Sequence, residues 1–113
     1  MIKGVDISTV LELERLKTKY YDNGVQNDLI DILASNGVNS VRLRLWNSPF
    51  DIDGVAYGGG SDDLVTVIEI AKRCSSAGMS FLLDFHYSDF WADTGRQVKP
   101  KAWKNYELPR LCE

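Results

Sequence analysis

The chain has 113 residues and a formal net charge of −3, with 44% hydrophobic and 26% charged residues. This composition is typical of a globular domain and argues against disorder. Acids and bases are interspersed, which excludes the clustered Lys and Arg of a nucleic-acid binder, and no apolar run approaches the roughly 18 residues of a membrane span. We therefore expect an uncharged ligand, no nucleic-acid partner and no membrane partner.

The two cysteines, Cys74 and Cys112, have neither metal-ligand spacing nor the density of a disulfide scaffold, so both are predicted to be free thiols. The first residues enter a strand pattern at once, without the basic and apolar segments of a signal peptide. We expect a cytoplasmic protein if Met1 is the true start and a secreted one otherwise.

Alternating apolar and polar residues predict three short strands, at 3–8, 41–46 and 81–86. Helical spacing predicts a helix over 28–35 that follows Asn27 and stops at Gly37. It predicts a second helix over 62–77, with Ser61 available as the N-cap and Gly78 as the stop. The two glycines lie roughly 40 residues apart, the repeat length of one βα unit, so the order is β-α-β-α-β.

The strand faces distinguish two α/β architectures. A central strand of a doubly wound sheet is apolar on both faces, whereas a barrel strand presents polar groups at its inner end. Here all three strands have a polar inner face. It carries Asp6 and Ser8, then Arg42, Arg44 and Trp46, then Asp84 and His86. These charges require a paired internal site, so we predict the first three strands of an incomplete (β/α)8 TIM barrel.

Gly58, Gly59 and Gly60 precede the second helix and could suggest a phosphate loop. No Lys-Ser or Lys-Thr follows, however, and Asp62 and Asp63 stand where the phosphate would lie. The favoured interpretation is a flexible βα loop whose acids suit a helix N-terminus.

His86 is the only histidine, and it could be a metal ligand, a hydrogen-bonding partner of substrate or of a catalytic carboxylate, or a structural residue. Arg42 and Arg44 could form barrel salt bridges only. The three tryptophans could be core residues. Trp91, however, falls in a polar loop where an exposed aromatic ring is better explained as a ligand platform, while for Trp103 the two interpretations are balanced.

Several motifs resemble the endo-β-1,4-galactanases of glycoside hydrolase family 53. They are Lys3-Gly4-Val5-Asp6-Ile7-Ser8, Gly37 to Trp46, Tyr57-Gly58-Gly59 and, above all, Leu83-Asp84-Phe85-His86-Tyr87-Ser88-Asp89-Phe90-Trp91-Ala92-Asp93. The resemblance runs from Lys3 to about Trp103 but covers only about the first third of such a domain. It implies a retaining enzyme that cleaves β-1,4-galactan side chains of pectin.

The resemblance also implies roles for the strand-end residues. Arg42 would orient the nucleophile, Asp6 would brace Arg42 or Arg44, His86 and Asp89 would contact sugar hydroxyls, and Trp91 would stack on a sugar face. The complete set expected to bind substrate or support the site is Asp6, Arg42, Arg44, Trp46, Asp84, His86, Asp89 and Trp91.

In that family two strand-end glutamates perform the chemistry, and neither strand is expected in this chain. The glutamates present are Glu12, Glu14, Glu69, Glu107 and Glu113, none of which ends a predicted strand. We therefore predict no catalytic pair, no metal and no cofactor, and an inactive, poorly folding chain that lacks the remainder of the barrel.

Residues 1–113 are interpreted as part of a single catalytic domain. The segment 108–112 has the spacing of a third helix that begins near the end of the chain. Two alternatives stay open: a non-catalytic galactan-binding or half-barrel interaction module, and a related barrel glycosidase acting on another β-1,4-glycan.

Overall fold

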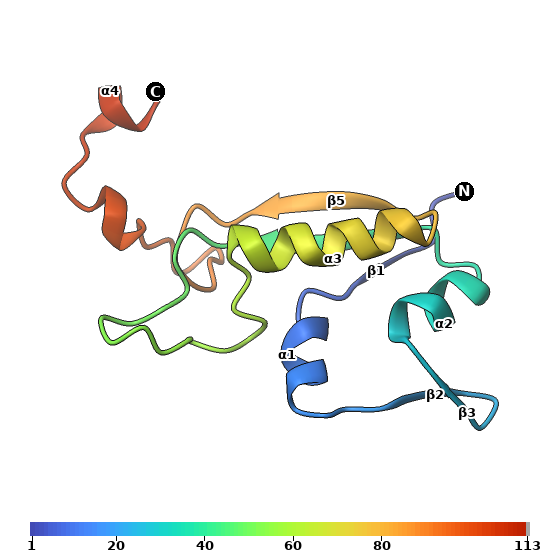
Figure 1. Ribbon diagram of the computed structural model, residues 1–113. Coiled ribbons are helices and arrows are strands. Elements are labelled where there is room, and N and C mark those ends of the chain that lie inside the picture. Colours follow the sequence, from blue (N-terminus) through green and yellow to red (C-terminus); the bar gives the residue numbers. More distant parts are fainter. Residues whose placement is uncertain (113) are drawn as a thin grey trace.

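A parallel sheet of three strands organises the chain, and the computed structural model describes residues 1–112 (Figure 1). The strands are β1 (Gly4–Asp6), β4 (Ser40–Leu45) and β5 (Ser80–Phe85), in the spatial order β1-β4-β5. Gly4 pairs with Ser40, and Ser40 pairs with Ser80, so all three strands start at the same level. The predicted β-α-β-α-β order is confirmed.

Two helices connect these strands. Helix α2 (Leu29–Ser35) is capped by Asp28, whose carboxylate accepts a hydrogen bond from the Ile30 N–H at 2.8 Å. Helix α3 (Leu64–Ser76) is capped by Asp63, which accepts from the Thr66 N–H at 2.9 Å. The prediction that Ser61 caps this helix was wrong. Ser61 lies two residues before the observed cap, Asp63, and it is buried with a φ of 50°, which suits the loop rather than a cap.

The segment 10–27, for which the sequence pattern predicts no element, also folds. It contains α1 (Val10–Arg15) and a two-stranded hairpin of β2 (Tyr20–Asp22) and β3 (Val25–Asn27). Asn23 and Gly24 form the turn with φ values of 47° and 80°, and positive φ at both positions is what a tight hairpin turn requires. The Asn-Gly pair was therefore a readable signal.

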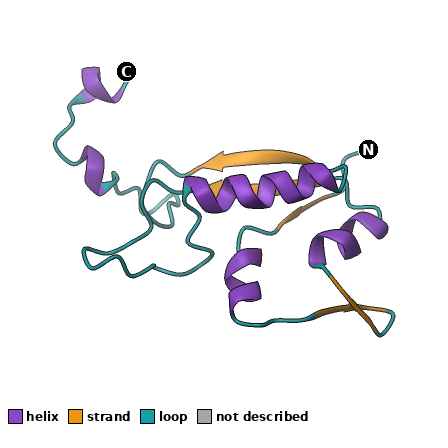
Figure 2. Ribbon diagram, in the orientation of Figure 1, coloured by secondary structure: helices purple, strands orange, loops and turns teal. Residues whose placement is uncertain are grey.

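The core lies between α3, α1, α2 and the outer face of the sheet, and α3 runs along the strands (Figures 1 and 2). Its buried members are Ile7, Val10, Leu11, Ile30, Val41, Leu43, Val67, Ile70, Cys74 and Met79. Phe81 and Phe85 of β5 lie on the sheet face opposite Asp84, yet they are 48% and 52% exposed. Their strand β5 is at the edge of the sheet, so no described element covers them.

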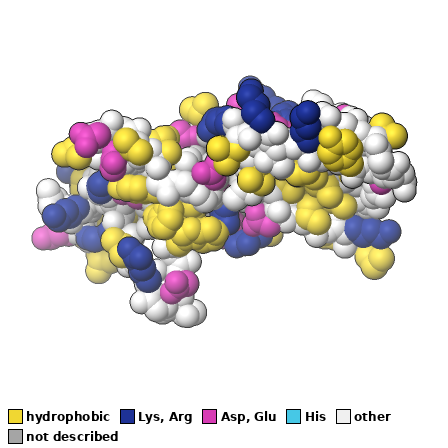
Figure 3. All heavy atoms as spheres, turned by 90° about the horizontal axis from the view of Figure 1, so that it is seen from below, with side chains coloured by type: hydrophobic (Ala, Val, Ile, Leu, Met, Phe, Trp, Pro, Cys, Tyr) yellow, Lys and Arg dark blue, Asp and Glu magenta, His cyan; other side chains and the backbone are white. Residues whose placement is uncertain are grey.

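After β5 the chain forms mainly loops, with the 3-10 helix η1 (Lys101–Trp103) and the short helix α4 (Leu108–Leu111) standing away from the sheet (Figure 2). The predicted helix near 108–112 is thus confirmed, and so are the two free thiols, Cys74 buried and Cys112 exposed. No described helix has the length and apolarity needed to cross a membrane. Seen from below, hydrophobic side chains are exposed in several places between charged ones (Figure 3).

Candidate active-site wall

Polar side chains gather where the three parallel strands end. Asp6 is the last residue of β1, Arg42 and Arg44 belong to β4, Asp84 belongs to β5, and His86 follows β5 directly. The register places Asp6 beside Arg42, and Arg44 beside Asp84. Because paired residues of parallel strands project from the same face, these side chains share the inner face of the sheet.

Arg42 bridges two carboxylates on neighbouring strands. Its Nη1 donates to Oδ2 of Asp6 at 3.0 Å, and its Nη2 donates to Oδ2 of Asp84. Asp6 is itself held by Ser8, whose backbone N–H and hydroxyl both donate to Oδ1, at 2.9 and 2.7 Å. The expected brace from Asp6 therefore goes to Arg42, whose half-exposed side chain stands over the open face of the sheet.

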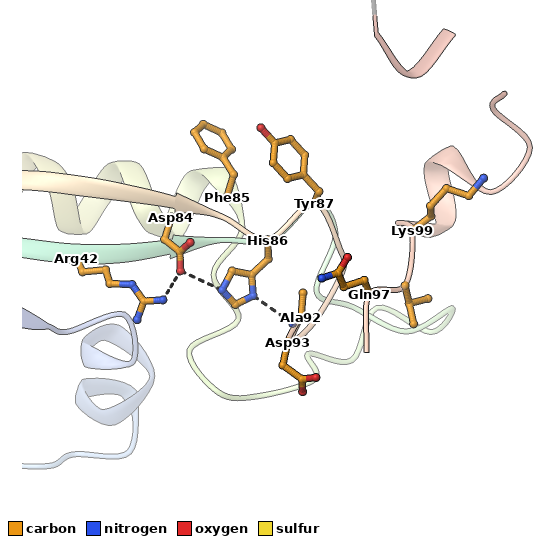
Figure 4. A pocket seen from close by; sticks show the side chains of 10 residues that line it. Arg42, Asp84, Phe85, His86, Tyr87, Ala92, Asp93, Gln97 and Lys99 are labelled. Atoms are coloured by element: carbon orange, nitrogen blue, oxygen red, sulfur yellow. Dashed lines mark hydrogen bonds and ion pairs between the residues drawn. The ribbon is translucent and has the colours of Figure 1, made fainter. Parts of the chain in front are cut away.

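His86 extends this network on the side of Asp84 (Figure 4). Its Nε2 lies 3.1 Å from Oδ2 of Asp84, and its Nδ1 accepts a hydrogen bond from Nε1 of Trp46 at 2.9 Å. The backbone N–H of Ala92 also points to Nδ1, at 3.4 Å. Both ring nitrogens are thus engaged within the protein.

Arg44 belongs to a separate, buried cluster. Its Nε donates to Asp62 at 3.0 Å, its Nη2 donates to the carbonyl of Gly59 at 2.7 Å, and its guanidinium carbon lies 4.1 Å from the ring centroid of Trp91. Burial raises the pKa of Asp62 to about 6, and the hydrogen bond from Arg44 opposes that rise. Arg44 is therefore buried against Trp91 and is not among the residues that line the two pockets described below.

Asp62 was missed as a member of the site. The sequence pattern places both Asp62 and Asp63 at the helix N-terminus, but only Asp63 caps the helix, whereas Asp62 is fully buried against Arg44. A buried arginine on a strand was a signal that a buried acid must exist. Arg44 also contacts the glycine loop, through its hydrogen bond to the carbonyl of Gly59.

Trp46 and Trp91 form an aromatic cluster next to this loop. Trp46 is 1% exposed and Trp91 is 43% exposed, and their ring centroids lie 5.5 Å apart in an edge-on arrangement. Gly59 allows this packing, because a Cβ there would lie 3.3 Å from both rings. Trp46 is therefore a core residue, while Trp91 keeps an exposed surface.

Asp89 has a different environment from His86. Its Oδ1 accepts from the Ser48 N–H at 3.0 Å, and its Oδ2 accepts from both the backbone N–H and Nζ of Lys101 at 2.8 Å. Since Asp89 is only 8% exposed and both oxygens are occupied, it ties three loops together. The structure does not bring it into the Arg42–Asp84–His86 network.

Two open pockets adjoin on this side of the molecule. The first, of about 530 Å³, is lined by Arg42, Asp84, Phe85, His86, Tyr87, Ala92, Asp93, Gln97, Val98 and Lys99 (Figure 4). The second, of about 430 Å³, is lined by Tyr57, Ser88, Asp89, Phe90, Trp91, Arg96, Val98, Lys99 and Lys101. They share Val98 and Lys99, so charged side chains in one pocket continue into an aromatic surface in the other. Such a surface suits a chain of sugars, whose hydroxyl groups need hydrogen bonds and whose flat faces stack on aromatic rings.

Parallel strands joined by helices, with a paired polar network at the strand ends, define a partial (β/α)8 barrel. The chain belongs to glycosyl hydrolase family 53, whose sequence model matches residues 2–112.

Two curated relatives show the extent of the similarity. An endo-beta-1,4-galactanase of Bacillus subtilis is 50% identical over 105 residues, which is 92% of this chain and 24% of that protein. An arabinogalactan endo-beta-1,4-galactanase A of Aspergillus niger is 42% identical over 110 residues, 96% of this chain and 29% of that protein. The match thus spans only 24% to 29% of the length of these relatives.

Solved structures agree. The GH53 catalytic domain of Ignisphaera aggregans superposes with a TM-score of 0.94 at 51% identity, covering 97% of this chain and 31% of that domain. A fungal beta-1,4-galactanase superposes with a TM-score of 0.79 at 43% identity, covering 91% of this chain and 29% of that one.

Proposed function

We propose that this chain forms the first three strands of the catalytic barrel of a retaining endo-β-1,4-galactanase and builds one wall of its substrate site. Residues 1–113 would then be part of a single catalytic domain. The observation that carries the proposal is Arg42, held between Asp6 and Asp84 at the strand ends, within a chain of this family.

The substrate would be β-1,4-galactan, a neutral polymer. Arg42 and Asp84 line the first pocket and offer charged hydrogen-bonding groups to sugar hydroxyls, while Trp91 lines the second pocket with its exposed ring surface. Arg44 holds the other side of the Trp91 ring, so the platform is rigid before a sugar arrives.

The chemistry would need two further groups. A retaining mechanism uses an acid/base and a nucleophile about 5 Å apart. The described glutamates have other positions: Glu12 accepts from the Gly60 N–H, Glu14 pairs with Arg73, and Glu69 and Glu107 are exposed outside the strands. Glu113 lies outside the described residues. We propose that both catalytic glutamates come from later strands and that Arg42 keeps the nucleophile ionised and oriented through charge-assisted hydrogen bonds.

The test compares the chain with a completed barrel, in which residues 2–112 replace the matching segment of the Bacillus subtilis relative. We expect the purified chain to release no sugar from β-1,4-galactan, and the completed barrel to release galacto-oligosaccharides. Mannan and cellulose serve as substrates for the rival glycosidases. Hydrolysis by the chain alone, or cleavage of mannan or cellulose in preference to galactan, would overturn the proposal, and galactan binding by the chain alone would favour a binding module.

A further inference from the structure

The indole N–H of Trp46 has one acceptor among the described residues, the Nδ1 atom of His86 at 2.9 Å. Trp46 is 1% exposed, so water does not compete, and an indole N–H can only donate. Leaving such a donor unpaired inside a protein is energetically costly. The Ala92 N–H points to the same nitrogen at 3.4 Å. Two donors directed at Nδ1 require a lone pair there, so the neutral ring carries its proton on Nε2.

The Nε2–H group then faces Asp84, whose Oδ2 lies 3.1 Å away and also accepts from Arg42. Trp46 therefore donates to His86, and His86 donates to Asp84. Arg42 donates to the same carboxylate oxygen of Asp84. The His86 side chain is 9% exposed and that of Asp84 is 28% exposed, so the carboxylate is the more accessible of these two pocket-lining groups.

We propose that Trp46 is a positioning residue: its indole N–H holds His86 as the Nε2-protonated tautomer, and His86 in turn fixes the Asp84 carboxylate that faces the pocket. Asp84 and Arg42, rather than His86, then make the polar contacts with a ligand. The last step rests on the proposed function, whereas the hydrogen-bond chain itself does not.

The surroundings of Trp46 keep its ring in this orientation. Its backbone N–H donates to the carbonyl of Asp62 at 2.8 Å, and Phe90 and Trp91 pack on the ring with centroid distances of 5.1 and 5.5 Å. Gly59 also lies close to the ring, since a Cβ at this position would be 3.3 Å from the Trp46 side chain. A ring held on several sides presents its N–H to one acceptor only.

Nuclear magnetic resonance tests the hydrogen-bond chain directly. His86 is the only histidine of the sequence, so the chain labelled with 15N in its histidine and tryptophan side chains gives one imidazole pair. Ligating the labelled chain to the unlabelled remainder of the completed barrel keeps that signal single and supplies the folded barrel. We expect an Nδ1 without a proton and a scalar coupling across the hydrogen bond between Nε1 of Trp46 and Nδ1 of His86. The absence of that coupling, or a proton on Nδ1, would overturn the proposal, and this readout needs no variant.

Matched variants then separate positioning from packing. Trp46→Phe keeps an aromatic ring but removes the N–H, and should shift the Nδ1 resonance, while Trp91→Phe, in the same cluster, should leave it unchanged. In the completed barrel we expect Trp46→Phe and His86→Leu to lower kcat on galactan about 10-fold with little change in KM. His86→Gln, which restores an N–H donor toward Asp84, should recover most of that loss.

An unchanged Nδ1 resonance in Trp46→Phe, or a His86→Gln variant as impaired as His86→Leu, would refute the positioning role. If the coupling is present but the completed barrel leaves galactan intact, the proposed function fails and the hydrogen-bond chain stands.

Discussion

Asp62 accepts a hydrogen bond from Nε of Arg44 at 3.0 Å, and the two side chains are 0% and 8% exposed. Burial raises the pKa of Asp62 from 3.8 to about 6. At a pH between 3.8 and about 6, Asp62 holds a proton in the folded state and releases it in the unfolded state. The contribution of this group to stability is therefore present below about pH 4 and is lost as pH rises through about 6.

Asp62→Asn imitates the protonated carboxyl and should remove this dependence. We compare the free energy of unfolding of the variant with that of the unmodified completed barrel. This difference should shift in favour of the variant by about 1–3 kcal/mol as the pH rises from 4 to 7. Urea unfolding at the two pH values measures the difference, with Asp53→Asn in an exposed loop as the control. A difference that is independent of pH would show that Asp62 has no raised pKa.

Arg42→Lys should damage function more than stability. A lysine cannot bridge Asp6 and Asp84 with a planar pair of donors, and exposed ion pairs contribute about 0–1 kcal/mol to folding. We expect kcat of the completed barrel on galactan to fall about 100-fold or more while the free energy of unfolding changes by less than about 1 kcal/mol. Arg15→Lys, on the exposed side of α1, is the matched control. Full activity in Arg42→Lys would remove Arg42 from the site.

Trp91→Ala should weaken galactan binding. Loss of an aromatic platform removes roughly 1 kcal/mol of stacking, which corresponds to about a fivefold rise in Kd. Calorimetry with galacto-oligosaccharides measures the change, and Tyr21→Ala is the control, because Tyr21 is a 58% exposed aromatic residue on the hairpin. Equal losses in both variants would mean that the sugar does not use Trp91.

Two glycines with the same backbone strain separate conformation from packing. Gly59 and Gly24 have φ values of 68° and 80°, but a Cβ meets the Trp46 and Trp91 rings only at Gly59 and meets nothing within 4 Å at Gly24. Each alanine substitution should cost about 1 kcal/mol for the backbone, and Gly59→Ala should cost about 1 kcal/mol more for displaced rings. Thermal unfolding of both variants in the completed barrel checks this, and equal Tm values would contradict it.

The chain alone should unfold without a sharp cooperative transition. Strands β1 and β5 are open edges, and Phe81, Leu82 and Phe85 on β5 are 48%, 62% and 52% exposed. Unpaired backbone groups and uncovered apolar side chains favour association over a unique fold. Calorimetry and sedimentation of the purified chain are the measurements, and a sharp melting transition of a monomer would refute the expectation.

The sequence predicted the strands well because their polar inner faces are unusual, and Asp6, Arg42, Asp84 and His86 could be placed on one side from alternation alone. Alternation could not predict which of these residues form ion pairs with one another. Arg42 and Arg44 are two residues apart on one face, yet one bridges two carboxylates over the pocket while the other is buried under Trp91.

Loop contacts were out of reach for a different reason. Asp89 lies in a motif that suggests sugar binding, but its oxygens are taken by Ser48 and Lys101, which come from distant loops. Likewise Asp62 and Asp63 are chemically identical neighbours, and only the path of the loop decides that one caps α3 and the other meets Arg44. Such choices depend on long-range geometry that spacing does not encode.

Because the three strands start at the same level, such a barrel can accept insertions in its strand-to-helix loops without disturbing the sheet. Gly37 and Gly78, with φ values of 85° and 79°, end α2 and α3 in the same left-handed turn, each shortly before a strand whose first residue pairs in register. Each helix-to-strand turn therefore resets the level of the next strand. Residues added on the opposite side, between a strand end and the following helix, leave the pairing untouched. Recombination at Gly37 and Gly78 should thus exchange whole strand-and-helix modules between homologous barrels while each keeps its own loops.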